Sequence, residues 1–332
     1  SHKKSKNKKV NNLREDNLKK QIIYKAFKYH SEGNIAEATT YYQSFIKQGF
    51  KDFRVFSNYG FILIGLGKLK EAELLYRKAI ALNPDYANAH LNLGNILKDL
   101  GKFKEAELLY RKAITLNPNF AEAYYNLGNI LIGLGKLKEA ELLYRKAIAL
   151  NPDYANAHLN LGNILKDLGK LKEAEVSLRE AIALNPNFAE AYSNLGNILK
   201  DLGKLKEAEV SLRKAIALNP NFAEAYYNLG NILKDLGKFK EAELLYRKAI
   251  VLKPNYEDAH YNLGNILTKI GKFKEAEVSL NKAIALNPHF AMAYNALSLL
   301  KYSDNNQIWQ NQLFSKSILN NKLPEDQIDI YF

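Results

Sequence analysis

The chain has 332 residues, of which 48 are Lys or Arg and 35 are Asp or Glu, so its net charge is +13, and 47% of its residues are apolar. This apolar fraction supports a packed protein and excludes a chain that is disordered throughout. The sequence has no Cys, which excludes disulfides, thiolate metal sites and cysteine nucleophiles and favours a reducing compartment. No stretch approaches the ~20 apolar residues of a membrane span, so we expect a cytoplasmic location and no span.

Residues 1–18 form a Lys- and Asn-rich segment that we expect to be a basic, flexible tail. Eight basic and two acidic residues lie in residues 1–20, so a large part of the net charge is concentrated there. No apolar core follows these charges, so the segment is not a secretory signal. Its lysines are not interleaved with aromatic residues, and a solvated tail is therefore favoured over binding to nucleic acid or anionic lipid.

Proline and glycine positions reveal an internal repeat of 34 residues. Seven prolines follow one another at this spacing from Pro84 to Pro288, and two series of glycines keep the same spacing. A fixed period of this length is typical of stacked supersecondary units. In residues 119–152, apolar residues at helical spacing predict two helices, with Gly135 ending the first and Pro152 ending the second.

The two predicted helices of a repeat must pack closely and need their neighbours. Asn119, followed by Glu122, has the spacing of a capping box and predicts the start of the first helix. Gly128 and Ala140 are small, which predicts that the two helices cross closely. Each pair has apolar faces on both sides and cannot bury them alone, so the repeats are expected to stack.

The repeating residues resemble the tetratricopeptide repeat. This resemblance implies an all-α fold, a right-handed superhelical solenoid of antiparallel helix pairs, with the first helix of each pair lining a concave groove. The residues that carry it in one repeat are Tyr124, Leu127, Gly128, Leu131, Ala140, Tyr144, Ala147 and Pro152.

The pattern divides the chain into segments. Residues 19–52 form a degenerate N-terminal repeat with Phe50 in place of the proline, and residues 53–290 contain seven consensus repeats. Residues 291–320 leave the pattern and are expected to form a capping helix pair. Residues 321–332 form a C-terminal segment that begins like a further helix, which favours a chain cut from a longer protein.

Asparagines recur on one face of the predicted first helices and are the strongest functional candidates. Asn is unfavourable inside a helix because its side chain competes for backbone hydrogen bonds, so its repetition needs a reason. Its amide carries a donor and an acceptor and can hold a peptide unit of an extended ligand. Similar rows hold extended chains in O-linked N-acetylglucosamine transferases, a resemblance that implies peptide binding here. The alternative is that these residues help the helices to pack.

The candidate peptide-binding residues fall into two rows of Asn and one set of Tyr. The Tyr side chains are predicted to form specificity pockets, with partly buried packing as the alternative. The first row is Asn58, Asn92, Asn126, Asn160, Asn194, Asn228 and Asn262; the second row is Asn95, Asn129, Asn163, Asn197, Asn231 and Asn265; the Tyr set is Tyr125, Tyr227 and Tyr261.

Neither a metal site nor a catalytic constellation is predicted. His90, His158 and His260 lie in different repeats without carboxylates at ligand spacing, so packing is favoured over metal binding. No catalytic triad or phosphate-loop pattern is present, so we expect no enzyme activity and no cofactor. The charges of the first helices predict a polar, slightly acidic groove, and the second helices carry a positive excess.

These observations predict a protein–protein interaction scaffold that binds a partner protein or an extended peptide in its groove. One alternative is a substrate-recruiting array of a larger glycosyltransferase or sulfotransferase. Another is a structural solenoid that associates with itself end to end or through its tail. Nucleic acid is not expected as a partner.

Overall fold

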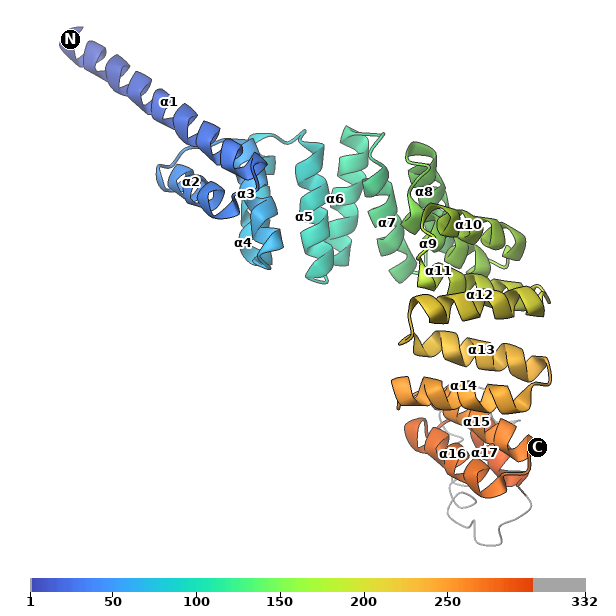
Figure 1. Cartoon of the computed structure of the whole chain (residues 1–332). Coiled ribbons are helices and arrows are strands. Elements are labelled where there is room, and N and C mark those ends of the chain that lie inside the picture. Colours follow the sequence, from blue (N-terminus) through green and yellow to red (C-terminus); the bar gives the residue numbers. More distant parts are fainter. Residues whose placement is uncertain (1, 301–332) are drawn as a thin grey trace. The chain divides into compact units, whose positions relative to one another are not determined.

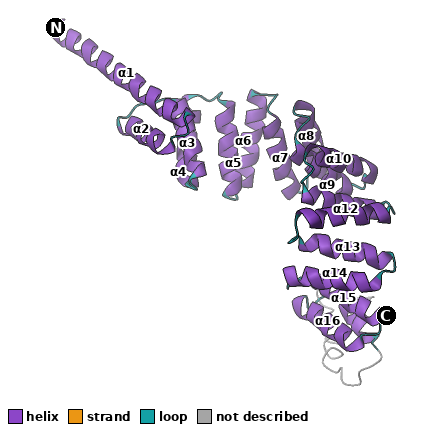
Figure 2. Ribbon diagram, in the orientation of Figure 1, coloured by secondary structure: helices purple, strands orange, loops and turns teal. Residues whose placement is uncertain are grey.

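A computed structural model describes residues 2–300, and the side chains of residues 13–300, as a succession of helices joined by short loops (Figures 1 and 2). Within this range there are 17 helices and no strand, which confirms the predicted all-α helix-pair fold. Of the predicted capping pair, only α17 (Ala291–Ser298) is described. The rest of that pair and the segment 321–332 lie outside the described residues.

First and second helices of the repeats follow one another in turn along the chain. Two helices precede the consensus repeats, α1 (His2–Ser31) and α2 (Ile35–Lys47). The first helices of the repeats are α3 (Phe53–Gly65), α5 (Ala87–Asp99), α7 (Ala121–Gly133), α9 (Ala155–Asp167), α11 (Ala189–Asp201), α13 (Ala223–Asp235) and α15 (Glu257–Lys269). The second helices are α4 (Leu69–Leu82), α6 (Phe103–Leu116), α8 (Leu137–Leu150), α10 (Leu171–Leu184), α12 (Leu205–Leu218), α14 (Phe239–Leu252) and α16 (Phe273–Leu286).

Helix α1 differs from the predicted flexible tail, because it is helical from His2 onward. Its residues from 13 to 18 are exposed, and burial begins at Ile22 and Ala26. Lys, Leu, Arg and Glu favour a helix without tertiary contacts, and Asp16 and Lys20 form an ion pair one turn apart at 3.9 Å. The charge and low apolar content of this segment favoured a flexible tail, whereas its helix propensity accounts for the helix.

The two helices of a repeat approach closely where the sequence places glycine and alanine. An added Cβ on Gly128 would lie 2.9 Å from Cε1 of Tyr144, and Ala140 is fully buried. The turn that follows contains Gly135 at φ +72°, a left-handed conformation that glycine adopts without strain. The predicted close crossing and the predicted glycine turn are both confirmed.

The capping prediction for Asn119 is wrong. Helix α7 begins at Ala121, and the preceding residue, Phe120, makes no capping hydrogen bond with its side chain. Instead, Asn117 Oδ1 accepts the backbone N–H of Asn119 at 3.1 Å and orders the turn around Pro118. The asparagine before the proline therefore shapes the connection, and the one after it does not cap the helix.

The chain divides into two compact units, an N-terminal unit of residues 1–157 and a C-terminal unit of residues 158–332. Within each unit, ion pairs connect successive second helices. Arg111 pairs with Glu107 on its own helix at 2.7 Å and with Glu139 of the next repeat at 2.7 Å. The arginines on these helices are half exposed, so each pair contributes only a few tenths of a kcal/mol, up to about 1 kcal/mol. Between residues 2 and 300, no helix has the length and apolar content that crossing a bilayer requires.

Candidate functional site

The asparagine rows occupy the predicted places on the first helices, and all are at least half-buried. Two members of the first row, Asn126 and Asn262, are buried, with 7% and 8% of their surface exposed. An amide at this depth must satisfy its donor and acceptor within the protein. The hydrogen bonds that each asparagine already forms within the protein therefore decide whether its amide is available to a ligand.

Several asparagines join neighbouring repeats through hydrogen bonds. Asn95 Oδ1 accepts the hydroxyl of Tyr110 from its own repeat at 2.8 Å and the Nδ2 amide of Asn126 from the next repeat at 2.9 Å. In the C-terminal unit, Asn231 accepts Tyr246 at 2.8 Å and Asn262 at 3.0 Å. Packing between repeats, the alternative considered from the sequence, is thus a demonstrated role of these residues.

The first consensus repeat breaks this pattern. Phe61 stands where the later repeats carry the second-row asparagine, 15 residues before Tyr76. Among the described residues, the buried hydroxyl of Tyr76 has no hydrogen-bond partner. Burial raises the pKa of Tyr76 to about 12.

Phe61→Asn is therefore expected to raise the free energy of unfolding by about 1 kcal/mol, because it supplies an acceptor to a buried hydroxyl. Little packing is lost, since Phe61 is 61% exposed. Urea unfolding followed by circular dichroism measures the change. Phe61→Ala is the matched control, since it removes the ring without adding an acceptor; an equal gain in both variants would contradict the explanation.

The asparagine pair of α11 and α13 is different. Neither Asn197 nor Asn228 forms a hydrogen bond with any described residue, although the equivalent pair Asn163 and Asn194 is bonded at 2.8 Å. Both side chains line a cavity of about 520 Å³ on the first helices, whose wall also includes Glu190 and Ser193. A second cavity of about 290 Å³ lies between α9 and α11.

The two cavities form one furrow, because Glu190, Asn194 and Asn197 line both of them. We call this furrow the asparagine groove; it crosses α9, α11 and α13 within the C-terminal unit. Ser193 is 2% exposed, lines the groove and has no hydrogen-bond partner among the described residues. The groove therefore presents polar side chains, Ser193, Asn197 and Asn228, that form no hydrogen bond with described residues.

The charges of the groove agree with the slightly acidic surface expected from the sequence. Glu190 and Glu224 line its wider part, and Asp167 and Lys166 lie at its narrower end. Burial opposes ionisation of Glu224, but its own backbone amide and Lys253, 3.1 Å away, lower its pKa. Glu224 is thus ionised at neutral pH, and its charge is partly balanced by Lys253.

The three tyrosines predicted to form pockets lie against other aromatic rings. Tyr125 packs on Tyr154 with ring centroids 4.7 Å apart, and Tyr261 packs on Phe290 at 5.0 Å. Tyr227 packs on Tyr256 at 4.8 Å, and its hydroxyl accepts Asn262 Nδ2 at 3.0 Å. Each tyrosine is half-buried and joins a first helix to an aromatic residue of the next repeat. This is the packing alternative, and none of the three lines a cavity of the groove.

Two of the three histidines have a structural partner in the backbone. Nε2 of His90 lies 2.8 Å from the carbonyl oxygen of Pro84, and that of His260 lies 3.1 Å from Pro254. Burial lowers the pKa of His260, so this ring is neutral at pH 7 and donates to the carbonyl. Across residues 13–300, no three His, Asp or Glu side chains come together as a metal site would require.

Sequence reasoning missed the role of one place on the second helices, which holds Tyr in some repeats and Leu in others. Repeats with Tyr110 or Tyr246 give the second-row asparagine a hydroxyl donor, whereas Leu178 and Leu212 give it none. Asn197 lies beside Leu212 and is not bonded to Asn228, but Asn163 lies beside Leu178 and is bonded to Asn194, so the leucine alone does not decide the bonding. The sequence shows this change from Tyr to Leu at a fixed place in the repeat. That the Tyr hydroxyl reaches the second-row asparagine is visible only in the structure.

Comparisons with known proteins agree with the fold. Residues 85–297 match a family model described as the C-terminal domain of cilia and flagella-associated protein 70, and residues 60–101 match a model of the tetratricopeptide repeat. A search of curated proteins found no match.

Solved structures with a similar arrangement include the Cut9–Hcn1 hetero-tetramer of the APC/C, with 18% identity and a TM-score of 0.60 over 84% of this chain and 55% of that chain. PilF of Pseudomonas aeruginosa matches with 22% identity and a TM-score of 0.56 over 62% of this chain and 94% of that chain. YrrB, described as a tetratricopeptide-repeat protein with an unusual peptide-binding site, has 29% identity and a TM-score of 0.48 over 57% of this chain and 98% of that chain.

Proposed function

Because the chain belongs to the tetratricopeptide-repeat family represented by the C-terminal domain of cilia and flagella-associated protein 70, we propose that it is a scaffold that binds an extended segment of a partner protein in the asparagine groove. Proteins built from these repeats generally mediate protein–protein interactions. The proposal assigns recognition to the groove and no catalysis to the chain. It includes a cytoplasmic location, which a cysteine-free sequence favours.

The observation that carries the proposal is the pair Asn197 and Asn228, whose amides line the groove without hydrogen bonds to described residues. A peptide backbone has alternating donors and acceptors, and an Asn amide can satisfy one of each. Neighbouring first helices packed ~10 Å apart would meet an extended chain about every three residues, since such a chain advances ~3.3 Å per residue.

The candidate residues now separate into two classes. Asn126 and Asn262 are buried and bonded to the preceding repeat, so their role in binding a ligand is indirect. Asn197 and Asn228 present their amides to the groove, and Asn163 and Asn194 line it while bonded to each other. We therefore place direct ligand contacts on the groove-lining members and keep the remaining asparagines and the tyrosines as support.

Asn197→Ala with Asn228→Ala is expected to weaken binding of a groove peptide at least tenfold, because two hydrogen bonds of about 1 kcal/mol each are lost. Peptides selected from a displayed library on the unmodified chain would serve as probes, and their affinities would be measured by calorimetry. The urea midpoint of the double variant is expected to stay unchanged, since neither side chain holds another described residue.

Asn262→Ala is the matched control. It removes a buried amide that bonds both Asn231 and Tyr227, so it is expected to lower the free energy of unfolding by about 1–2 kcal/mol. If the selected peptides bind the double variant as tightly as the unmodified chain, the groove proposal is contradicted. Loss of stability in the double variant instead of loss of binding would show that these asparagines are structural too.

A further inference from the structure

The second helices carry an exposed apolar side chain at the same place in every consensus repeat. Exposed Leu and Val side chains of this kind normally occur singly and need no explanation. Here they recur at each 34-residue step, with between 60% and 70% of their surface exposed. We call them the apolar row: Leu74, Leu108 and Leu142 in the N-terminal unit, and Val176, Val210, Leu244 and Val278 in the C-terminal unit.

Lysines flank the apolar row one helical turn before and one turn after each member. Residues four apart lie on one helix face, so each apolar side chain stands between two cations. The lysines before it are Lys70, Lys104, Lys138, Lys172, Lys206, Lys240 and Lys274; those after it are Lys78, Lys112, Lys146, Lys214, Lys248 and Lys282, with Glu180 in the remaining place.

These flanking lysines are exposed, and they form no ion pairs with the described residues. Within residues 13–300, the ion pairs of the second helices use the arginines and the lysines that precede the helices, such as Arg213 and Lys238 with Glu209. No lysine of the two flanking rows forms an ion pair with a described residue. Their charges are therefore available to an external partner.

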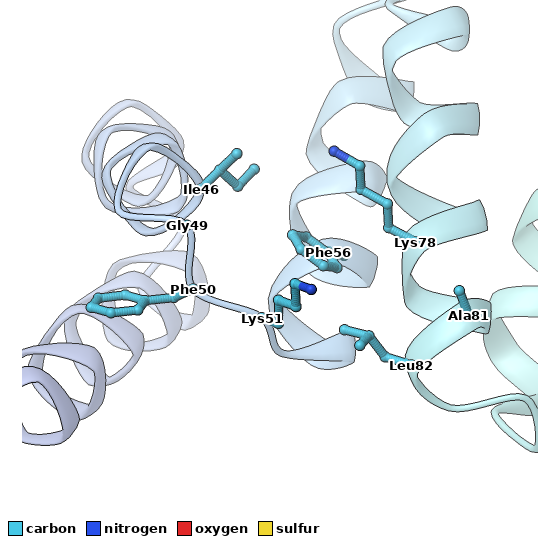
Figure 3. A pocket seen from close by; sticks show the side chains of 8 residues that line it. All are labelled: Ile46, Gly49, Phe50, Lys51, Phe56, Lys78, Ala81 and Leu82. Carbon is cyan, nitrogen blue, oxygen red and sulfur yellow. The ribbon is translucent and has the colours of Figure 1, made fainter. Parts of the chain in front are cut away.

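Each unit has a hollow that is lined by a flanking lysine, and the hollow of the C-terminal unit is also lined by a member of the apolar row. In the N-terminal unit, a cavity of about 400 Å³ lies between the end of α2 and α4, and Figure 3 shows Phe56 and Lys78 facing Ile46 across it. Lys78 Nζ lies 5.9 Å from the centre of the Phe56 ring. The hollow thus has an apolar wall and a lysine at its edge.

The hollow of the C-terminal unit shares two lining places with the first hollow. It has a volume of about 490 Å³ and lies between α10 and α12, with Tyr192 at the place equivalent to Phe56 and Lys214 at the place equivalent to Lys78. Val210 of the apolar row and Lys206 also line it. Ser211, at a place where four of the other six repeats carry leucine, contributes to the space.

We propose that the second-helix face of the C-terminal unit, formed by Val176, Val210, Leu244 and Val278 and their flanking lysines, docks on an anionic bilayer surface. The apolar side chains and hollows would take up acyl-chain carbon at the headgroup boundary, while the lysines reach phosphate oxygens with their ammonium groups. A bilayer also offers the same chemistry to each repeat of this unit. The surface is separate from the asparagine groove, so the two can be occupied independently.

Other occupants fit this face less well. A second copy would oppose lysine rows to lysine rows, which is repulsive. A nucleic acid would engage the lysines but leave the apolar row exposed. An acidic protein would have to repeat its own apolar and acidic groups at the period of this array.

Co-sedimentation with lipid vesicles tests the proposal on the full chain. Binding is expected to vesicles of equal parts phosphatidylglycerol and phosphatidylcholine, with little binding to phosphatidylcholine alone. The variant Lys206→Gln/Lys214→Gln/Lys248→Gln is expected to bind roughly a hundredfold more weakly, since each lysine near an anionic surface contributes about fivefold. Glu180→Lys is expected to tighten binding by a similar factor of about five.

Two further variants separate docking from unspecific attraction. Lys98→Gln/Lys200→Gln/Lys234→Gln removes the same charge from first helices and is expected to keep most of the binding. Val210→Ser/Leu244→Ser/Val278→Ser leaves the charge unchanged and is expected to weaken vesicle binding several-fold. Circular dichroism would verify that all variants are folded.

Three outcomes would overturn the inference. The first is absence of binding to the anionic vesicles. The second is an equal loss of vesicle binding in both lysine variants, which would mean adsorption by net charge. Unchanged vesicle binding in both variants would equally overturn the inference, because it would mean adsorption through the basic N-terminal residues. The third is full retention by the apolar variant together with equal affinity for a nucleic acid or polyglutamate probe, which would assign the face to a soluble charged partner.

Discussion

Raising the pH from about 10 to about 12 is expected to remove several kcal/mol from the free energy of unfolding, at about 1.4 kcal/mol per pH unit for each buried tyrosine that stays protonated in the fold. Burial raises the pKa of Tyr42 and Tyr76 to about 12, and it also raises the pKa of Tyr110 and Tyr246. All four side chains are fully buried.

The sign follows from proton binding. An unfolded tyrosine releases its proton near its ordinary pKa of 10.0, whereas the folded one holds it to higher pH. Above pH 10 the unfolded chain therefore binds fewer protons than the folded chain, and stability falls as pH rises. The stabilisation is fully present below that pH.

Urea unfolding followed by circular dichroism between pH 9 and pH 12 measures this loss, and tyrosine absorbance reports the ionisation directly. Tyr76→Phe is the matched control, because the hydroxyl that it removes has no partner among the described residues. The variant is expected to lose about 1.4 kcal/mol less per pH unit than the unmodified chain. Parallel curves for the two proteins would show that tyrosine burial is not the cause, since lysine titration affects both equally.

Gly128→Ala is expected to lower the free energy of unfolding by about 2 kcal/mol, although alanine is normally the better helix residue. The new Cβ would lie 2.9 Å from Cε1 and 3.0 Å from Cζ of Tyr144. This ring is fully buried, so α7 and α8 must separate or the ring must shift. The strain exceeds the gain of about 1 kcal/mol in helix propensity.

Gly133→Ala, in the same helix, is the control for that substitution. An added Cβ at Gly133 meets no atom within 4 Å, and its backbone is not left-handed. This variant is expected to gain up to about 1 kcal/mol from propensity alone. Thermal unfolding of the two variants side by side gives the comparison; a stabilised Gly128→Ala protein would contradict the close crossing.

The asparagine rows illustrate where sequence reasoning reached its limit. Their places on the first helices follow from the 34-residue period, and so does their common face. The period does not show whether an amide already forms hydrogen bonds within the protein. Asn126 reaches Asn95 at 2.9 Å, whereas Asn228, at the equivalent place, makes no such bond to Asn197. Hydrogen bonding depends on differences of a few tenths of an ångström, and no pattern of residue types resolves these.

The N-terminal residues illustrate a different limit. Charge and polarity favoured a flexible tail over residues 1–18, yet the helix that contains Ile22 and Ala26 continues back to His2. Helix formation is cooperative, so once packing fixes one end, each further residue adds a backbone hydrogen bond at small cost. The composition of residues 1–18 alone favours a tail, and the packed residues that follow them supply the nucleus from which the helix extends.

The sequence by itself determined the repeat, the pairing of helices, the close crossing at Gly128 and the turn at Gly135, because these depend on local geometry and on side-chain size. The sequence also contains the apolar row, but only the structure shows that its side chains are exposed. Tertiary structure decided which asparagines are free, why the Tyr76 hydroxyl is unsatisfied and where the groove opens. Those outcomes depend on contacts between residues about 15 to 31 positions apart, whose distances are set only when the repeats pack.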